Sequence, residues 1–178
     1  MTPIPNVLAA RYASEAMRRI WSPENKVVLE RRLWVAVLRA QRDLGVPMPA
    51  DVIDAHEAVV DQVDLRDIAA REKVTRHDVK ARIEAFCALA GYEHIHKGMT
   101  SRDLTENVEQ LQIRLGLSLV HERCITTLVR LAELAGSHAE TVMAGRSHNV
   151  AAQATTLGKR FANAGEELLQ ATRRLQGL

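Results

Sequence analysis

One long helical pattern in the second half of the chain restricts the possible folds more than any other feature. Between residue 102 and about residue 138, apolar residues recur at intervals of three and four, and only Gly116 interrupts them. This run of about 35 residues is roughly three times as long as the average globular helix. A second long helix is predicted over about 150–175. Two such helices joined by a short turn pack antiparallel, so the sequence predicts the opening hairpin of a long helical bundle.

The first half of the chain also follows helical patterns. Aromatic residues make up only 3 % of the sequence, and no period-two run indicates a strand. The clearest helix starts with Ser22 as its N-cap and Pro23 as its first residue, and it stops at Gly45. The further predicted elements are helices at about 50–60 and 65–73, a helix capped by Thr75 and ended by Gly91, and a loop over 91–100.

We therefore predict an all-α protein of two parts. Residues 1–99 form a small N-terminal helical domain, and residues 100–178 form the first long antiparallel helices of a central bundle domain. Each long helix needs more neighbours than these residues supply, so we regard the bundle as incomplete and a C-terminal domain as absent. The apolar stripes left without neighbours predict that copies associate through residues 102–175.

Composition narrows the class of partner. Hydrophobic residues make up 47 % and charged residues 26 %, and the net charge of +2 is spread along the chain. No basic block favours nucleic acid or an anionic membrane, and no apolar stretch approaches a membrane span. The two cysteines, Cys87 and Cys124, lie in helical apolar patterns without a CxxC spacing, which predicts free thiols in a reducing compartment. We expect a cytoplasmic protein whose partners bind at local sites.

Three predicted helix starts carry cations or imidazoles where the helix dipole disfavours them. Arg76 and His77 follow the Thr75 cap, Arg102 follows Ser101, and Arg146 and His148 precede the helix expected near residue 150. A bound anion would explain this repetition, because exposed backbone N–H groups, the dipole and an arginine fork together form a phosphate or carboxylate site. The pattern predicts acid–base chemistry on a multiply anionic small molecule.

Each of these residues also has a simpler explanation when it is taken alone. An isolated Arg76 or Arg102 is a solvated surface residue or an ion-pair partner, and Glu106 lies four residues beyond Arg102. An isolated histidine is most often structural. His94 and His96 are close enough in sequence to bind a metal, but no third ligand is apparent, so we predict no metal site.

Three motifs resemble one known family. They are "TRHDV" at 75–79, "HKGMTSRDLTEN" at 96–107 and "GRSHNVAAQATTLG" at 145–158, and they follow an "RY" pair at 11–12. Together they are similar to the adenylosuccinate lyase family of the fumarase/aspartase superfamily, over essentially the whole chain. The second and third motifs are shared across the superfamily, whereas "TRHD" with "RY" points to the adenylosuccinate branch.

The resemblance implies a cofactor-free anti β-elimination. Family members release fumarate from adenylosuccinate to give AMP and from SAICAR to give AICAR. A base removes the proton next to a carboxylate, and an acid protonates the departing nitrogen. The enzymes are homotetramers whose active sites take motifs from three subunits.

The resemblance also implies roles for individual residues. His148 corresponds to the general acid, and His77 assists orientation or proton transfer. The residues implied to bind substrate are Arg11 and Tyr12 at the nucleotide phosphate, Arg76, His77 and Asp78 of the "RHD" motif, His96 in the pocket wall, and Thr100 and Ser101 at a succinyl carboxylate. The family's general base is a serine on a loop that these residues do not include, so we expect the chain alone to be inactive.

Two other interpretations stay open. The chain could belong to another superfamily lyase or cycloisomerase, such as argininosuccinate lyase or the carboxymuconate enzyme. It could also be a helical assembly module that keeps the long helices without the chemistry, although such a module does not need Arg76, Arg102 and His148 at their positions.

Overall fold

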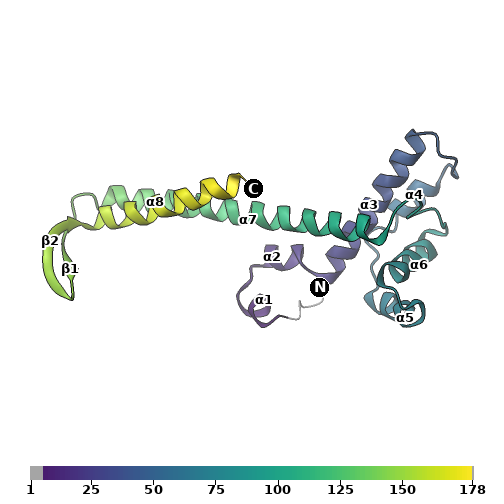
Figure 1. The fold of residues 1–178 in the computed structure, drawn as a ribbon, viewed down its shortest axis with the longest axis horizontal. Helices are drawn as coiled ribbons and strands as arrows, with labels where there is room; N and C mark the ends of the chain where they lie inside the picture. The colour runs from purple at the N-terminus through teal and green to yellow at the C-terminus, as the bar shows by residue number, and fades with distance from the viewer. Residues whose placement is uncertain (1–5, 178) are drawn as a thin grey trace. The chain divides into compact units, whose positions relative to one another are not determined.

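The computed structural model describes residues 6–177, which fold into two compact units that part between Arg114 and Leu115. The described residues form eight helices and one two-stranded hairpin (Figure 1), which confirms the predicted all-α class apart from the hairpin. The helices of the first unit are α1 (Val7–Tyr12), α2 (Glu15–Ile20), α3 (Pro23–Asp43), α4 (Val52–Glu57), α5 (Leu65–Thr75) and α6 (Asp78–Ala90). Helix α7 (Ser101–Ser137) belongs to both units, and β1 (Val142–Ser147), β2 (Val150–Thr156) and α8 (Leu157–Gln176) complete the second.

Helix α3 has the ends that its sequence predicts. The Ser22 hydroxyl accepts a hydrogen bond from the Asn25 backbone N–H at 3.2 Å, and Pro23 is the first helical residue. At the other end, Gly45 adopts a positive φ of 81°, which favours glycine.

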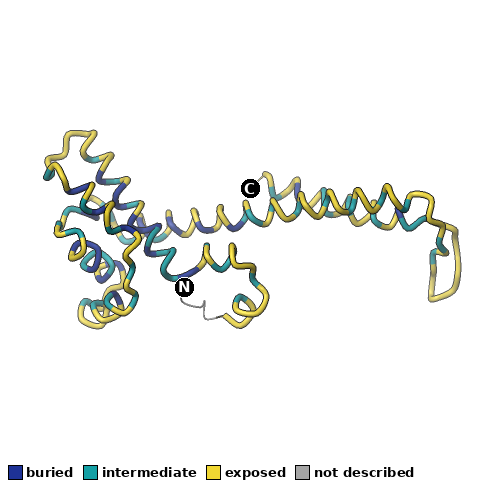
Figure 2. Tube along the Cα trace, turned by 180° about the vertical axis from the view of Figure 1, so that it is seen from behind, coloured by how far each residue is buried: buried dark blue, intermediate teal, exposed yellow. Residues whose placement is uncertain are grey.

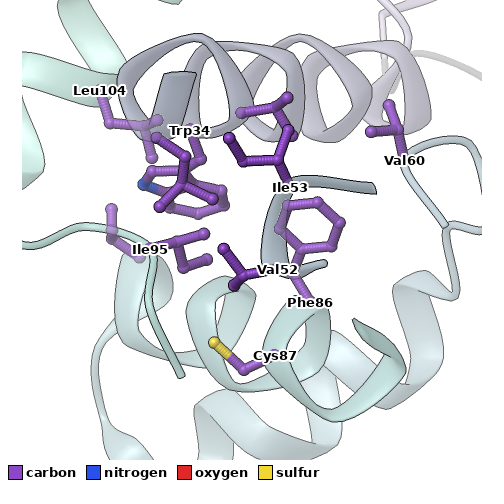
Figure 3. Close-up of a cluster of buried hydrophobic side chains, with 11 residues drawn as sticks. Trp34, Val52, Ile53, Val60, Phe86, Cys87, Ile95 and Leu104 are labelled. Atoms are coloured by element: carbon purple, nitrogen blue, oxygen red, sulfur yellow. The ribbon is translucent and has the colours of Figure 1, made fainter. Parts of the chain in front are cut away.

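The core of the first unit gathers around Trp34. Its indole is fully buried and stacks on Phe86 of α6 with the ring centroids 6.1 Å apart. The cluster is completed by Val52 of α4, Ile95 of the loop at 91–100 and Leu104 of α7 (Figure 3). Burying a side chain of this size contributes about 1.5–3 kcal/mol, so this cluster fixes the loop at 91–100 and the start of α7 against α3.

The junction of α5 and α6 differs from the prediction. Thr75 is the last residue of α5 and not the N-cap of α6, because α5 continues until the Arg76 N–H bonds the Glu72 carbonyl at 2.8 Å. Arg76 is the left-handed C-cap of α5, with a φ of 52°, and His77 is the N-cap of α6. Arg76 therefore lies at the negative end of a helix dipole, where a cation is favoured.

Helix α7 confirms the long helix predicted from the sequence, with 37 residues from Ser101 to Ser137. Arg102 pairs with Glu106 at 3.3 Å on its exposed surface, which is the simpler of the two explanations for this cation. The division near residue 114 falls inside this helix, whereas the predicted domain boundary at residues 99 and 100 lies just before its start and stays a prediction.

The predicted helix start near residue 150 is wrong, because residues 142–156 form an antiparallel hairpin. His148 and Asn149 make its two-residue turn, with φ of 49° and 62°, as in type I′ turns. Arg146 donates from Nη1 to the Asn149 carbonyl at 2.9 Å. Helix α8 begins only at Leu157, after Thr156 as its N-cap. Arg146 and His148 are therefore not at a helix N-terminus. Of the residues on which the anion prediction rested, His77 at the α6 start and Arg102 at the α7 start keep that placement.

Within the second unit, α8 packs antiparallel along the last half of α7. The Gly158 N–H at the start of α8 donates to the His138 carbonyl at 2.8 Å. At the end of α8, Gln176 Nε2 lies 3.0 Å from His121 Nε2 of α7. Much of the outer surface of both helices is exposed (Figure 2), including Ile125 and Val129 of α7. In the described residues, no helix is long and apolar enough to cross a membrane.

Candidate functional site

The structure brings the "TRHD" and "TSRD" motifs into contact. His77 at the start of α6 places Nε2 at 3.5 Å from Oγ of Ser101, the first residue of α7. The two residues are 24 apart in sequence, and the core around Trp34 packs α6 and α7 against the same helix. A histidine and a serine at a helix N-terminus provide hydrogen-bond donors that suit a carboxylate.

His77 is held in one orientation by its backbone neighbours. Its Nδ1 accepts the Lys80 backbone N–H at 3.3 Å, so the neutral ring carries its proton on Nε2, facing Ser101. The Thr75 hydroxyl accepts from the His77 N–H at 3.4 Å and donates to the His77 carbonyl at 3.1 Å. Thr75 therefore supports the turn that carries the histidine, although it caps no helix.

Asp78 is tied to a buried ion pair that sequence reasoning missed. Arg82 contacts both the Asp78 carboxylate and that of Glu30, and its Nε donates to the Asp78 carbonyl at 3.2 Å. Glu30 is fully buried on α3, and this burial raises the pKa of its carboxyl, while Arg82 opposes the shift. In the sequence, the i, i+4 spacing of Asp78 and Arg82 could have predicted their ion pair, but nothing indicated the pair with Glu30.

His96 lies in the loop before α7 and faces the core. Its Nδ1 accepts the Trp34 indole N–H at 3.1 Å. Burial lowers the pKa of His96, and nearby His77 lowers it further while Asp103 raises it. Its backbone is left-handed, with a φ of 67°. An open groove of about 680 Å³ adjoins the ring and is lined in part by Lys80, Cys87 and Lys97.

Thr100 and Ser101 form the N-terminal edge of α7. The Thr100 backbone N–H donates to the Asp103 carboxylate at 2.7 Å, which is one half of a capping box. Arg102 pairs with Glu106 on the exposed surface, whereas the hydroxyls of Thr100 and Ser101 lie at the helix N-terminus, where an anion is favoured.

The remaining predicted residues are not part of this cluster. Arg11 and Tyr12 end α1, and both are exposed. His148 is exposed at the turn of the hairpin in the second unit. Across the described part of the chain, no group of three histidine, cysteine or acidic residues is placed to hold a metal.

Backbone strain concentrates at predicted site residues. Four non-glycine residues of the described chain have positive φ, and three of them, Arg76, His96 and His148, were predicted from the sequence to touch substrate or transfer a proton. Such conformations cost about 1–3 kcal/mol each and persist where the surrounding structure enforces them, often at functional sites.

Comparison with known proteins gives a consistent family. The family described as "Lyase" matches residues 9–178. The adenylosuccinate lyase of Schistosoma mansoni is 33 % identical over 167 residues, which cover 92 % of this chain and 35 % of that protein. The N-acetyl-S-(2-succino)cysteine lyase of Dickeya dadantii is 29 % identical over 173 residues, which cover 95 % of this chain and 38 % of that protein.

Two solved structures share the fold. The fumarate lyase from Mesorhizobium sp. BNC1 aligns with a TM-score of 0.79 and 28 % identity, over 90 % of this chain and 39 % of its own. The 3-carboxy-cis,cis-muconate lactonizing enzyme from Pseudomonas putida aligns with a TM-score of 0.84 and 24 % identity, over 96 % of this chain and 41 % of its own. The chain thus spans little more than a third of the length of the curated relatives described above. Because the family match covers nearly all of its residues, the chain belongs to the lyase family, with adenylosuccinate lyases among its relatives.

Proposed function

We propose that this chain is part of an adenylosuccinate lyase that releases fumarate from adenylosuccinate and from SAICAR, without a cofactor. The observation that carries the proposal is the 3.5 Å approach of His77 Nε2 to Ser101 Oγ, which joins the branch-specific motif to the superfamily motif. The relatives named adenylosuccinate lyase support the same assignment.

In the proposed reaction, this site holds the succinyl end of the substrate. Thr100 and Ser101 offer their hydroxyl donors to a carboxylate at the N-terminus of α7. Negative charge grows on that carboxylate when the neighbouring carbon loses its proton, and fixed donors lower the barrier by stabilising this charge. His77, with its proton on Nε2, orients the same group, and Arg76 adds a cation one residue earlier.

The departing nitrogen needs a proton, for which we propose His148. Its place in an exposed two-residue turn lets it enter a site assembled from several copies. Arg11 and Tyr12, also exposed, are proposed to bind the nucleotide phosphate. We propose a cytoplasmic homotetramer in which the exposed apolar side chains of α7 are covered by other copies, and a serine base from outside these residues.

The test is a fumarate-release assay on the complete protein that contains this chain. The His148→Ala variant should lower turnover by orders of magnitude while the circular dichroism spectrum stays unchanged, and His121→Ala on α7 is the matched control with near-normal turnover. Near-normal turnover of His148→Ala would remove His148 from the acid role. Robust turnover by the 178-residue chain alone would refute the need for an outside base.

A related elimination with a sulfur leaving group is the second candidate. The Dickeya dadantii relative is named for a succinylated cysteine, at 29 % identity. Running the same assay with S-(2-succino)cysteine derivatives separates the two, since faster turnover of the thioether would favour this candidate.

If neither AMP nor fumarate raised the melting temperature of the complete protein, a non-catalytic assembly module would be favoured instead.

A further inference from the structure

The buried indole of Trp34 determines which nitrogen of His96 can carry a proton. Trp34 is fully buried on α3, and its Nε1 lies 3.1 Å from His96 Nδ1. An indole N–H only donates, so Nδ1 must be the accepting nitrogen. A neutral imidazole has one donor and one acceptor nitrogen, which leaves the proton of His96 on Nε2.

Packing holds both rings in this arrangement. The indole stacks on the Phe86 ring with the centroids 6.1 Å apart, and it meets the His96 imidazole edge-on with the centroids 6.0 Å apart. The loop is fixed from the other side, because Gln41 Nε2 donates to the Lys97 carbonyl at 2.9 Å. The imidazole therefore has little freedom to turn over and exchange its nitrogens.

We propose that Trp34 is a positioning residue that holds His96 as its Nε2–H tautomer, so that His96 serves as a neutral hydrogen-bond donor and not as a base. The catalytic half of this inference rests on the proposed lyase function, whereas the tautomer is a property of the chain itself. The substrate group it would address is an oxygen of the succinyl carboxylate or of the nucleotide.

The surroundings of His96 agree with a neutral donor. Protonating Nδ1 would set its new N–H against the indole N–H and lose the hydrogen bond. Burial also lowers the pKa of His96; of the charged neighbours, His77 disfavours the imidazolium and Asp103 favours it. Among the described residues Nε2 has no hydrogen-bond partner, so its N–H is available to a ligand.

The first test reads the tautomer directly in the 178-residue chain. Long-range proton–nitrogen NMR of ¹⁵N-histidine-labelled protein distinguishes the two tautomers, and the His96→Gln variant assigns the signal. We expect Nε2–H in the unmodified chain and a tautomer mixture with a higher pKa in Trp34→Phe, which keeps a ring but removes the donor. Phe86→Leu is the matched control, because it loosens the same packing and leaves the indole N–H in place.

The second test measures coupling in the complete enzyme. Trp34→Phe should lower kcat several-fold with little change in KM, and His96→Gln, whose amide still donates, should retain more turnover than His96→Ala. Adding Trp34→Phe to His96→Gln should not lower kcat any further, since glutamine has no tautomer to fix. Equal losses in both backgrounds would show that Trp34 acts only through packing.

The two tests fail separately. An Nδ1–H signal in the unmodified chain, or an unchanged spectrum in Trp34→Phe, would overturn the inference whatever the enzyme catalyses. Absence of lyase turnover in the complete protein would overturn the proposed function and leave the tautomer result standing.

Discussion

Removing the charge of Arg82 should destabilise the first unit strongly, because Glu30 has no access to water. The Glu30 side chain is 0 % exposed and that of Arg82 only 12 %. In Arg82→Met the aliphatic stem remains, but the Glu30 carboxylate is left buried without its cation. Breaking a buried ion pair from one side costs about 3–5 kcal/mol, and we expect a loss of this size in the free energy of unfolding.

The stability lost in Arg82→Met should also depend on pH. Burial is the largest influence on Glu30 and raises its pKa above the usual 4.5, and Arg82 is the largest influence in the other direction. Arg82→Met therefore raises the folded-state pKa further. A raised carboxyl pKa means that the folded state binds the proton more tightly than the unfolded state, so stability falls as pH rises from about 4.5 through the folded pKa. The loss caused by Arg82→Met should be smaller at acidic pH than at pH 8.

Urea unfolding followed by tryptophan fluorescence measures this loss, since Trp34 is buried in the same unit. The double variant Glu30→Gln with Arg82→Met should recover much of it, because no buried charge then remains. Arg102→Met is the matched control, since its pair with Glu106 is exposed and worth about 0–1 kcal/mol. A cost below about 1 kcal/mol for Arg82→Met, or one that does not change with pH, would refute this reasoning.

Three further local features can be tested: the α6 cap, the close approach at Gly158 and the burial of Cys87. His77→Ala should lower the free energy of unfolding by about 1 kcal/mol through loss of the α6 cap, and His77→Asn, which still caps, should restore stability but not turnover; equal stability of the two in urea unfolding would contradict this. A Cβ on Gly158 would come under 3.0 Å from two backbone carbonyl oxygens, so Gly158→Ala should destabilise the second unit by about 1–3 kcal/mol. In the control Gly136→Ala, the added Cβ meets no atom within 4 Å, so the melting temperature of the second unit should stay unchanged or rise. Burial raises the pKa of the Cys87 thiol to about 11, so mass spectrometry should find iodoacetamide at pH 8 on Cys124 well before Cys87, and the reverse order would contradict the burial.

Helix ends could be predicted where a residue with one strong preference occupies them. Ser22, Pro23 and Gly45 each have such a preference, and the bounds of α3 follow from them. The hairpin could not, because the large apolar residues of β1 and β2 are Val142, Met143 and Val150, whose spacing shows neither a helical nor a strand period. The turn also lacks the glycine that usually marks type I′ geometry, since His148 and Asn149 occupy both central positions.

For the candidate site, the sequence supplies a list of residues but not their geometry. The motifs named His77, His96 and Ser101, and the structure adds the 3.5 Å contact between the first and the last. Trp34 and Glu30 gave no signal of their own, since an apolar face of α3 is where a tryptophan is expected and a glutamate is usually solvated. Contacts of this kind join residues more than 50 positions apart and arise only when α3, α6 and the following loop pack together.

The left-handed backbones of Arg76 and His148 have a consequence for selection experiments. Glycine adopts such conformations without strain, so it should be the most heat-resistant choice at both positions. At His96, which is also left-handed, glycine would leave the buried Trp34 N–H without its acceptor. A library screened only for survival at high temperature should accumulate glycine at positions 76 and 148, and a library screened for growth that depends on turnover should keep arginine and histidine there. The residues recovered at these two positions would thus report whether a population was selected for stability or for turnover.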